Sequence, residues 1–348
     1  MVVLVHHTSY FYPIPHHARV VFDTLINAHA AIVFFFVLSG FVLALSVMRF
    51  GSTFGFYIKR AFRILPAFWL TTAICSIYIL SFGSEAGSQV LDWPRGMIIE
   101  PSWTPKIIFY CLGGLPFLIG SAYTVVAEIL GSAAIPPLLY VSQAKIMYGA
   151  MMIAVLGGLS FWFYDAPDAT RYLMFMVHFA LGVFVALILR RNPAMKIGVS
   201  LTAVFSFGLI FSRQVVMIVY SGSPQDLDYE YHFPANGLLE GLFSAALVLA
   251  VTTRRDPILR LPPLTWIGNI SYGIYLLHLP ALFLSARFAG AVGVKTAPVQ
   301  FVILITLTLL ITLPSATLMY RFVEKPCIAV GERLAARKFS RARMKPAE

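Results

Sequence analysis

Nine runs of about 20 mostly apolar residues follow one another along the 348-residue chain, and each is long enough to cross the hydrocarbon core of a membrane as a helix. They lie at residues 31–48, 65–82, 122–141, 147–164, 172–190, 197–213, 237–253, 265–284 and 299–320. A shorter run from residue 1 to about residue 12 is predicted to form an incomplete first helix. Residues 107–120, which glycine and proline interrupt, are predicted to form a short re-entrant piece. The sequence therefore predicts an all-α fold, a polytopic membrane helix bundle with about ten transmembrane helices.

The composition excludes the main classes of soluble protein. Charged residues make up 12% of the chain and hydrophobic residues 59%, whereas soluble domains have about 25% charged residues. This charge content is too low for the surface of a soluble enzyme or for a disordered chain. The three cysteines, Cys75, Cys111 and Cys327, lack the spacing of metal ligands or of a disulfide framework. We therefore expect no metal site.

The distribution of basic residues predicts how the chain is oriented. It has 26 Lys and Arg residues, and an outward first helix places 19 of them on the inner side and 7 on the outer side. We expect a multi-pass membrane protein with outward loops at 83–106 and 214–236 and a cytoplasmic C-terminus. The predicted organisation is one membrane domain, residues 1–326, and a basic cytoplasmic tail, residues 327–348. Because topology accounts for the basic excess, we expect no nucleic-acid partner.

Polar residues inside the apolar runs are candidates for chemistry, because hydrocarbon solvates them poorly. His6 and His7 lie at the end of the first run, and imidazole can accept or give a proton near neutral pH. The alternative is a pair of histidines solvated at the end of a span. Glu128 lies well inside a run, where a carboxylate must be paired, protonated or in contact with water. For Glu128 a structural ion pair is the alternative to a functional role.

Three further polar residues are assigned structural roles. His178 and His278 lie in apolar spans, and we expect both to be packing histidines with satisfied hydrogen bonds. Glu240 lies close to the outer boundary of a span, where we expect it to be solvated.

Arg60 and Arg63 lie in a segment that we interpret as a loop at the cytoplasmic mouth of a span. Residues three apart share a face if the segment is helical. Guanidinium groups suit phosphates, because their N–H donors match two phosphate oxygens. The alternative is that the two arginines set the topology and contact lipid headgroups.

Five short motifs follow one another along the chain. They are Phe35-Phe36-Val37-Leu38-Ser39-Gly40-Phe41, Arg60-x-x-Arg63-Ile-x-Pro66, Tyr123-Thr124-x-x-x-Glu128 with Pro136, Ile270-Ser271-Tyr272-Gly-Ile-Tyr275-Leu-Leu-His278-Leu-Pro280, and Tyr320-Arg321-Phe322-Val323-Glu324-Lys325-Pro326. In this order the motifs resemble those of the acyltransferase-3 family of membrane proteins. The likeness covers residues 1 to about 326.

The resemblance implies about ten membrane helices and transfer of an acyl group, usually acetyl, from acyl-CoA to a hydroxyl of a cell-envelope glycan or glycolipid. With it we expect the chain to lie in the bacterial inner membrane. It implies a catalytic histidine on the first helix, which matches His6, with His7 as the alternative. We expect Glu128 to orient a histidine or the acceptor, and Arg60 and Arg63 to hold the CoA phosphates. Acyl-CoA is then a donor substrate, and no tightly bound cofactor is expected.

The chain departs from the family pattern at three positions. Tyr123 stands where Trp is usual, and Val33 where many members have Asp. The family has an arginine about ten residues before the histidine, whereas the sequence begins five residues before His6 and lacks it; a start codon assigned too far downstream and a decayed copy of the gene are the two explanations. Two alternative functions remain, a transporter or flippase of a lipid-linked sugar and an inactive family member. The flippase hypothesis predicts pseudo-symmetric repeats, which the sequence does not show.

Overall fold

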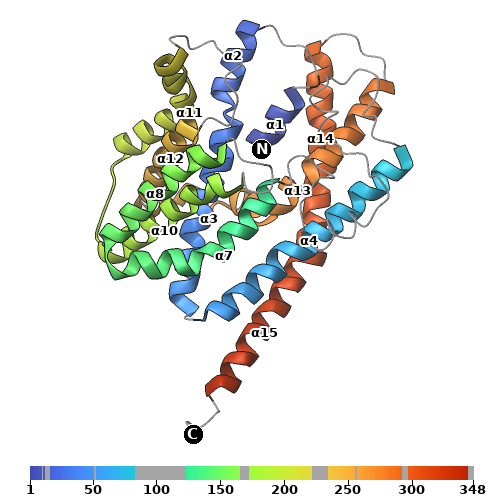
Figure 1. The fold of residues 1–348 in the computed structure, drawn as a ribbon. Coiled ribbons are helices and arrows are strands. Elements are labelled where there is room, and N and C mark those ends of the chain that lie inside the picture. Colours follow the sequence, from blue (N-terminus) through green and yellow to red (C-terminus); the bar gives the residue numbers. More distant parts are fainter. Residues whose placement is uncertain are drawn as a thin grey trace.

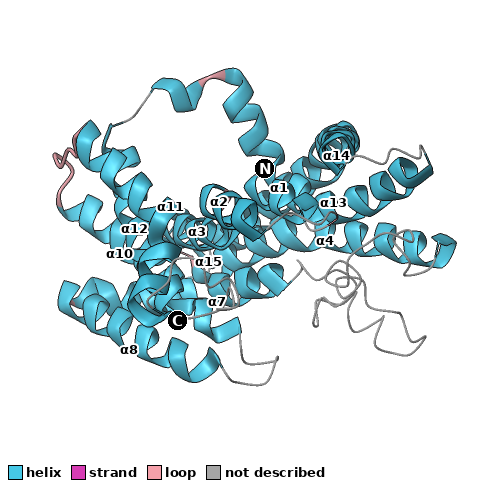
Figure 2. Ribbon diagram, turned by 90° about the horizontal axis from the view of Figure 1, so that it is seen from above, coloured by secondary structure: helices cyan, strands magenta, loops and turns pink. Residues whose placement is uncertain are grey.

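The computed structural model describes residues 1–9, 11, 16–50, 52–82, 123–164, 172–221, 234–254, 257–291 and 297–343. Within these residues every regular element is a helix and no strand occurs (Figure 2), which confirms the predicted all-α class. The helices are α1 (Val2–Ser9), α2 (His16–Leu25), α3 (Ala28–Phe50), α4 (Thr53–Phe82), α7 (Tyr123–Ala144), α8 (Ile146–Tyr164), α10 (Met176–Arg191), α11 (Val199–Ser221), α12 (Pro234–Arg254), α13 (Pro262–Ala291), α14 (Ala297–Met319) and α15 (Lys325–Arg343). Shorter elements are the 3₁₀-helices η2 (Tyr172–Phe175) and η3 (Pro257–Arg260) and the π-helix η4 (Tyr320–Glu324).

Nine helical segments in the described part of the chain are long and apolar enough to cross a membrane, and each coincides with one of the nine predicted runs. The protein is therefore a multi-pass membrane protein. Helix α1 has only eight residues and ends at Ser9, somewhat earlier than predicted. Residues 107–120 lie outside the described residues, so the re-entrant piece stays a prediction.

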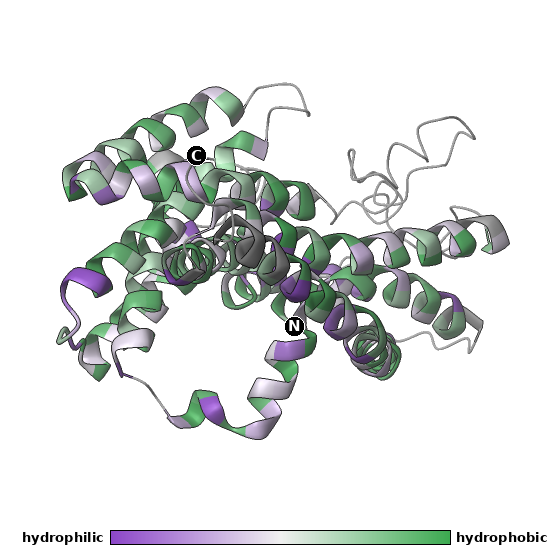
Figure 3. Ribbon diagram, turned by 90° about the horizontal axis from the view of Figure 1, so that it is seen from below, coloured by the Kyte–Doolittle hydropathy of each residue, from purple (hydrophilic) through white to green (hydrophobic). Residues whose placement is uncertain are grey.

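Large apolar side chains cover the outer faces of the bundle. Trp162, Val219 and Phe322 are 78%, 73% and 66% exposed, and hydrophobic residues colour most of the length of the helices (Figure 3). Such faces suit lipid tails, and the helices satisfy their own backbone hydrogen bonds there.

Helix α4 begins earlier than the sequence predicted. It runs from Thr53, so Arg60 and Arg63 lie within a helix, and their interpretation as part of a loop was wrong. The first half of α4 gains its packing from α15, a contact between segments far apart in sequence. Pro66 lies inside the helix, where proline removes one backbone donor without ending α4.

The helices form two groups with α1 between them (Figure 1). In the first group α3 packs against α7, α10 and α12, while α8 and α11 cover that core; in the second, α13 packs on α14 and α4 on α15. Helix α1 contacts α3 on one side and α13 and α14 on the other. Its side chains can therefore meet residues of both groups.

Helix α15 extends beyond the bundle and carries the C-terminus away from it (Figure 1). It continues directly from η4, so a helix crosses the predicted domain boundary at residue 326. The division into a membrane domain and a tail stays a prediction.

Helices α3 and α10 approach closely at two glycines. A Cβ atom placed on Gly182 would lie 2.1 Å from the carbonyl oxygen of Val37, and one on Gly40 would lie 2.3 Å from that of Phe179. Small residues allow membrane helices to bring their backbones together in this way. Gly40 belongs to the first of the five motifs, so one structural role of that motif is to allow α3 to pack closely on α10.

We expect Gly182→Ala to destabilise the protein by about 1–3 kcal/mol, because the added methyl group forces α3 and α10 apart. Thermal melting of the purified protein in detergent measures the loss. Gly158→Ala on α8 is the matched control, since a Cβ there meets no atom within 4 Å. Equal melting temperatures for the two variants would contradict the close packing.

Candidate functional site

His6 and His7 lie next to each other on α1 and are buried, with 6% and 8% exposure. Nδ1 of His6 is 3.5 Å from Oδ1 of Asp23 on α2. Nε of Arg19, one turn earlier on α2, donates a 2.8 Å hydrogen bond to Oδ2 of Asp23, and its Nη1 donates to the Ser9 hydroxyl at 3.1 Å. The carboxylate can therefore orient the His6 ring and stabilise it when it is protonated.

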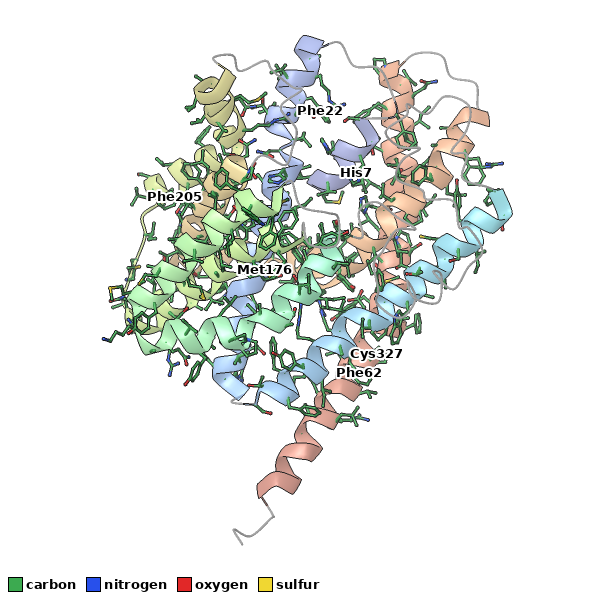
Figure 4. All side chains as sticks on the ribbon, in the orientation of Figure 1. His7, Phe22, Phe62, Met176, Phe205 and Cys327 are labelled. Carbon is green, nitrogen blue, oxygen red and sulfur yellow. The ribbon has the colours of Figure 1, made fainter. Side chains whose placement is uncertain are left out.

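His7 has a different partner, from the second helix group. Its Nδ1 lies 3.0 Å from Nε2 of His278 on α13, and the two rings are nearly parallel, at 18°. Nδ1 of His278 in turn donates a 2.5 Å hydrogen bond to the carbonyl oxygen of Tyr275. Figure 4 shows His7 on α1, well above Phe62 of α4. We call His6, His7, Asp23 and His278 the histidine cluster.

Arg60 and Glu128 form an ion pair between α4 and α7, with side-chain exposures of 18% and 8%. Nε of Arg60 also donates a 3.1 Å hydrogen bond to the Ser132 hydroxyl. Arg63 lies close enough to Glu324 of η4, which is 1% exposed, for their charges to interact. We call Arg60, Arg63, Glu128 and Glu324 the arginine cluster.

Two tyrosines of α13 connect the two clusters. The Tyr272 hydroxyl donates a 3.0 Å hydrogen bond to the Ile64 carbonyl of α4, and the phenol interacts with the charges of the arginine cluster. The Tyr275 hydroxyl accepts a 2.5 Å hydrogen bond from Thr124, which lies one turn before Glu128 on α7. Four of the five sequence motifs therefore meet in one region of the bundle.

The structure brings two of the predicted site residues, Arg60 and Glu128, into direct contact, and it places His6 in the other cluster. The described ion-pair partner of Glu128 is Arg60, so an orienting role toward a histidine or an acceptor stays a prediction. Chemically, the histidine cluster can accept a proton from a hydroxyl group, and the arginine cluster can bind a phosphate.

Asp23 and Arg19 are residues of this region that were not singled out from the sequence. Arg19 and Asp23 lie one turn apart on α2. Their spacing of four residues was a usable signal for a helical ion pair. His278 was expected only to pack, and its contact with His7 depends on the tertiary fold.

A third polar group lies between α3 and α12. Glu240 is 1% exposed and pairs with His29, while Nδ2 of Asn27 donates a 3.1 Å hydrogen bond to it. The expectation that Glu240 is solvated was wrong, because α11 covers it and brings the Ser212 hydroxyl to 3.5 Å. His178 is buried as expected and lines a small cavity together with His29. Its Nδ1 has no hydrogen-bond partner among the described residues, so the expectation of satisfied hydrogen bonds was wrong for this atom.

Comparison with known proteins shows which protein family this chain resembles over most of its length. The sequence profile of the acyltransferase 3 family, described as an acyltransferase domain, matches residues 1–317. "Putative peptidoglycan O-acetyltransferase YrhL" of Bacillus subtilis (strain 168) is 25% identical over 87% of this chain and 51% of its own length. "Nodulation protein 10" of Rhizobium leguminosarum bv. viciae is 33% identical over 21% of this chain and 20% of its own length. No solved structure matches the chain.

The chain spans about half the length of the first relative and about a fifth of the second. The profile match nevertheless covers every residue of the histidine cluster and four of the five motifs. It also confirms the resemblance on which the sequence interpretation rests. The chain belongs to the acyltransferase 3 family of membrane proteins.

Proposed function

We propose that this chain transfers an acyl group, acetyl in the first instance, from acyl-CoA to a hydroxyl group of a cell-envelope glycan. The observation that carries the proposal is the burial of His6 against Asp23, whose second oxygen is held by Arg19. A histidine held by a carboxylate is suited to act as a general base on a hydroxyl. The relative named for peptidoglycan O-acetylation makes peptidoglycan the first acceptor to test.

The proposed chemistry moves one proton and one acyl group. The acceptor hydroxyl gives its proton to Nε2 of His6 as its oxygen attacks the acyl carbonyl carbon. The bond between that carbon and the CoA sulfur breaks, CoA leaves as the thiolate, and the proton on His6 passes to the thiolate or to water, which restores the neutral imidazole. The reaction needs the two substrates and no further cofactor.

The arginine cluster is proposed to hold the phosphates of CoA. Arg60 is fixed by Glu128 and Ser132, so its remaining guanidinium donors are held in a defined direction. Arg63 faces Glu324, and a bound phosphate would offer it a second anionic partner.

Arg63→Ala is expected to weaken acetyl-CoA binding by about tenfold to a hundredfold, since a charge-assisted hydrogen bond contributes about 1.5–3 kcal/mol. Arg63→Lys is expected to recover part of this, because an ammonium group lacks the planar fork. Isothermal titration of the purified protein with acetyl-CoA gives the affinities. Arg333→Ala, an exposed arginine of α15, is the control. If folded Arg63→Ala binds acetyl-CoA with unchanged affinity, Arg63 does not hold CoA, and the alternative that it sets the membrane topology is favoured.

We propose the bacterial inner membrane as the location, with the C-terminus and the arginine cluster on the cytoplasmic side. The uneven distribution of Lys and Arg supports this orientation. Single cysteines placed in a cysteine-free chain, at 83–106, 214–236 or after 327, are labelled from outside intact cells with an impermeant maleimide. The first two segments are expected to react and the third to be protected. A labelled tail with protected loops would overturn both the orientation and the placement of CoA.

The function itself is tested with labelled acetyl-CoA and membrane vesicles that contain the chain. Peptidoglycan fragments and lipopolysaccharide are offered separately, and both the labelled glycan and the released CoA are measured. Acyl transfer is supported by label in a glycan together with an equal amount of CoA. If neither appears while the protein is folded, the chain is inactive or serves another function.

A further inference from the structure

We propose that His7 is a second catalytic residue, which carries the acyl group on its Nε2 atom between acyl-CoA and the acceptor, and that His278 is its proton partner. The proposal rests on the acyl transfer proposed above and replaces the direct attack of the acceptor on the thioester by two steps through a covalent intermediate. Its basis is the contacts of two adjacent buried histidines of α1, which face partners on different helices. His6 faces Asp23 of α2, and His7 faces His278 of α13.

The hydrogen bonds of His278 determine which nitrogen of His7 carries the proton. A carbonyl oxygen only accepts hydrogen bonds, so Nδ1 of His278 carries the proton that it donates to Tyr275. Because an unpaired buried charge is costly, we assign both imidazoles as neutral. Nε2 of His278 is then the acceptor for the proton on Nδ1 of His7. This assignment leaves Nε2 of His7 unprotonated, which is the form that attacks a carbonyl carbon.

The two histidines can serve different substrates. Consecutive residues of an α-helix point about 100° apart, and the rings of His6 and His7 have centroids 5.9 Å apart and an interplanar angle of 49°. The partner of His7 lies on α13, the helix whose Tyr275 also accepts a hydrogen bond from Thr124 of α7. His7 is therefore connected to the helices of the arginine cluster, whereas His6 faces Asp23 and Arg19 on α2.

The covalent step is balanced within the cluster. Nε2 of His7 attacks the thioester carbonyl carbon, the bond from that carbon to sulfur breaks, and CoA leaves as the thiolate. The proton on Nδ1 of His7 passes to Nε2 of His278, so the acyl-imidazole is neutral and His278 is the cation. In the second step His6 takes the proton of the acceptor hydroxyl, whose oxygen attacks the acyl group on His7. His7 then recovers its proton from His278, and the proton on His6 goes to the thiolate or to water.

If His7 carries the acyl group, the protein is expected to exchange CoA with acetyl-CoA in the absence of any glycan acceptor. The full chain, purified in lipid nanodiscs without glycan, is incubated with acetyl-CoA and isotopically labelled CoA, and label entering acetyl-CoA is followed. Wild-type protein is expected to catalyse the exchange, and His7→Gln to reduce it to background. His6→Gln is expected to retain the exchange while it loses transfer to a glycan, because His6 acts only in the second step.

His278 is tested as a positioning residue by two substitutions. His278→Gln keeps an oxygen that can accept the His7 hydrogen bond but does not take up the proton, whereas His278→Phe does neither. We expect exchange to fall in both, further in His278→Phe, by about 10²–10⁴-fold as for loss of a general base. Acetyl-CoA affinity, which a merely structural loss would lower, is expected to be unchanged in His278→Gln.

The outcomes separate this inference from the proposed function. If the wild-type protein transfers the acyl group to a glycan but shows no exchange, the acyl-His7 intermediate is disproved, whereas the proposed transferase function is supported. Exchange that persists in His7→Gln, or that is lost in His6→Gln alone, would also overturn the assignment. If the folded protein shows neither exchange nor transfer, the proposed function fails and the inference with it.

Discussion

Arg60→Ala is expected to destabilise the protein by about 3 kcal/mol, because it leaves the carboxylate of Glu128 buried without its partner. The side chain of Glu128 is 8% exposed, and Arg60 is the cation that the structure places against it. The loss is measured as a fall in the melting temperature of the purified protein, and as a smaller folded fraction in gel filtration after heating.

A second substitution distinguishes the lost ion pair from lost packing. Glu128→Gln introduced into the Arg60→Ala background removes the unpaired charge and keeps a similar side-chain volume, so it is expected to restore much of the stability. Glu332→Ala, an exposed acid of α15, is the control for losing a charge at the surface. If Arg60→Ala melts with the wild type, the Arg60–Glu128 pair contributes nothing to folding, and Arg60 is held for ligand binding alone.

The nine spans could be predicted because hydrocarbon imposes one simple requirement, a long apolar helix, at every crossing. Arg60, Glu128 and His6 could likewise be singled out from the sequence, because polar residues stand out against apolar runs and the motifs resemble those of a known family. The start of α4 could not be predicted, because the charged segment around Arg60 looks like a loop until α15 is known to pack against it. A local stretch of sequence gives no information about its contacts with residues more than 200 positions away.

The partners within the site depended on the same long-range packing. Asp23 reaches His6 only because α2 returns beside α1, and His278 reaches His7 from 271 residues away. Glu240 was misjudged for the opposite reason: its position near the end of a span suggested contact with water, but His29 of α3 and Ser212 of α11 lie against it. The sequence could thus single out candidate residues for chemistry, whereas the residues that they contact depended on the tertiary packing.

His6→Ala is expected to lower acyl transfer by about 10²–10⁴-fold, the usual contribution of a general base. The hydroxyl of the acceptor must lose its proton as it attacks, and a neutral imidazole accepts a proton near pH 7. Acetyl-CoA affinity is expected to be nearly unchanged, because the arginine cluster lies on other helices. Transfer of label from acetyl-CoA to the glycan gives the rate, and titration with acetyl-CoA gives the affinity.

Two further variants show whether the loss belongs to the basic nitrogen of His6. His6→Asn keeps a polar group but lacks the basic nitrogen, so it is expected to be as slow as His6→Ala. Asp23→Asn keeps the His6 ring and removes the negative charge that stabilises its protonated form, so an intermediate rate with a changed pH profile is expected. If His6→Asn transfers at the wild-type rate, His6 is a structural residue. The general base would then have to be sought at His7, the only other histidine in the described part of α1.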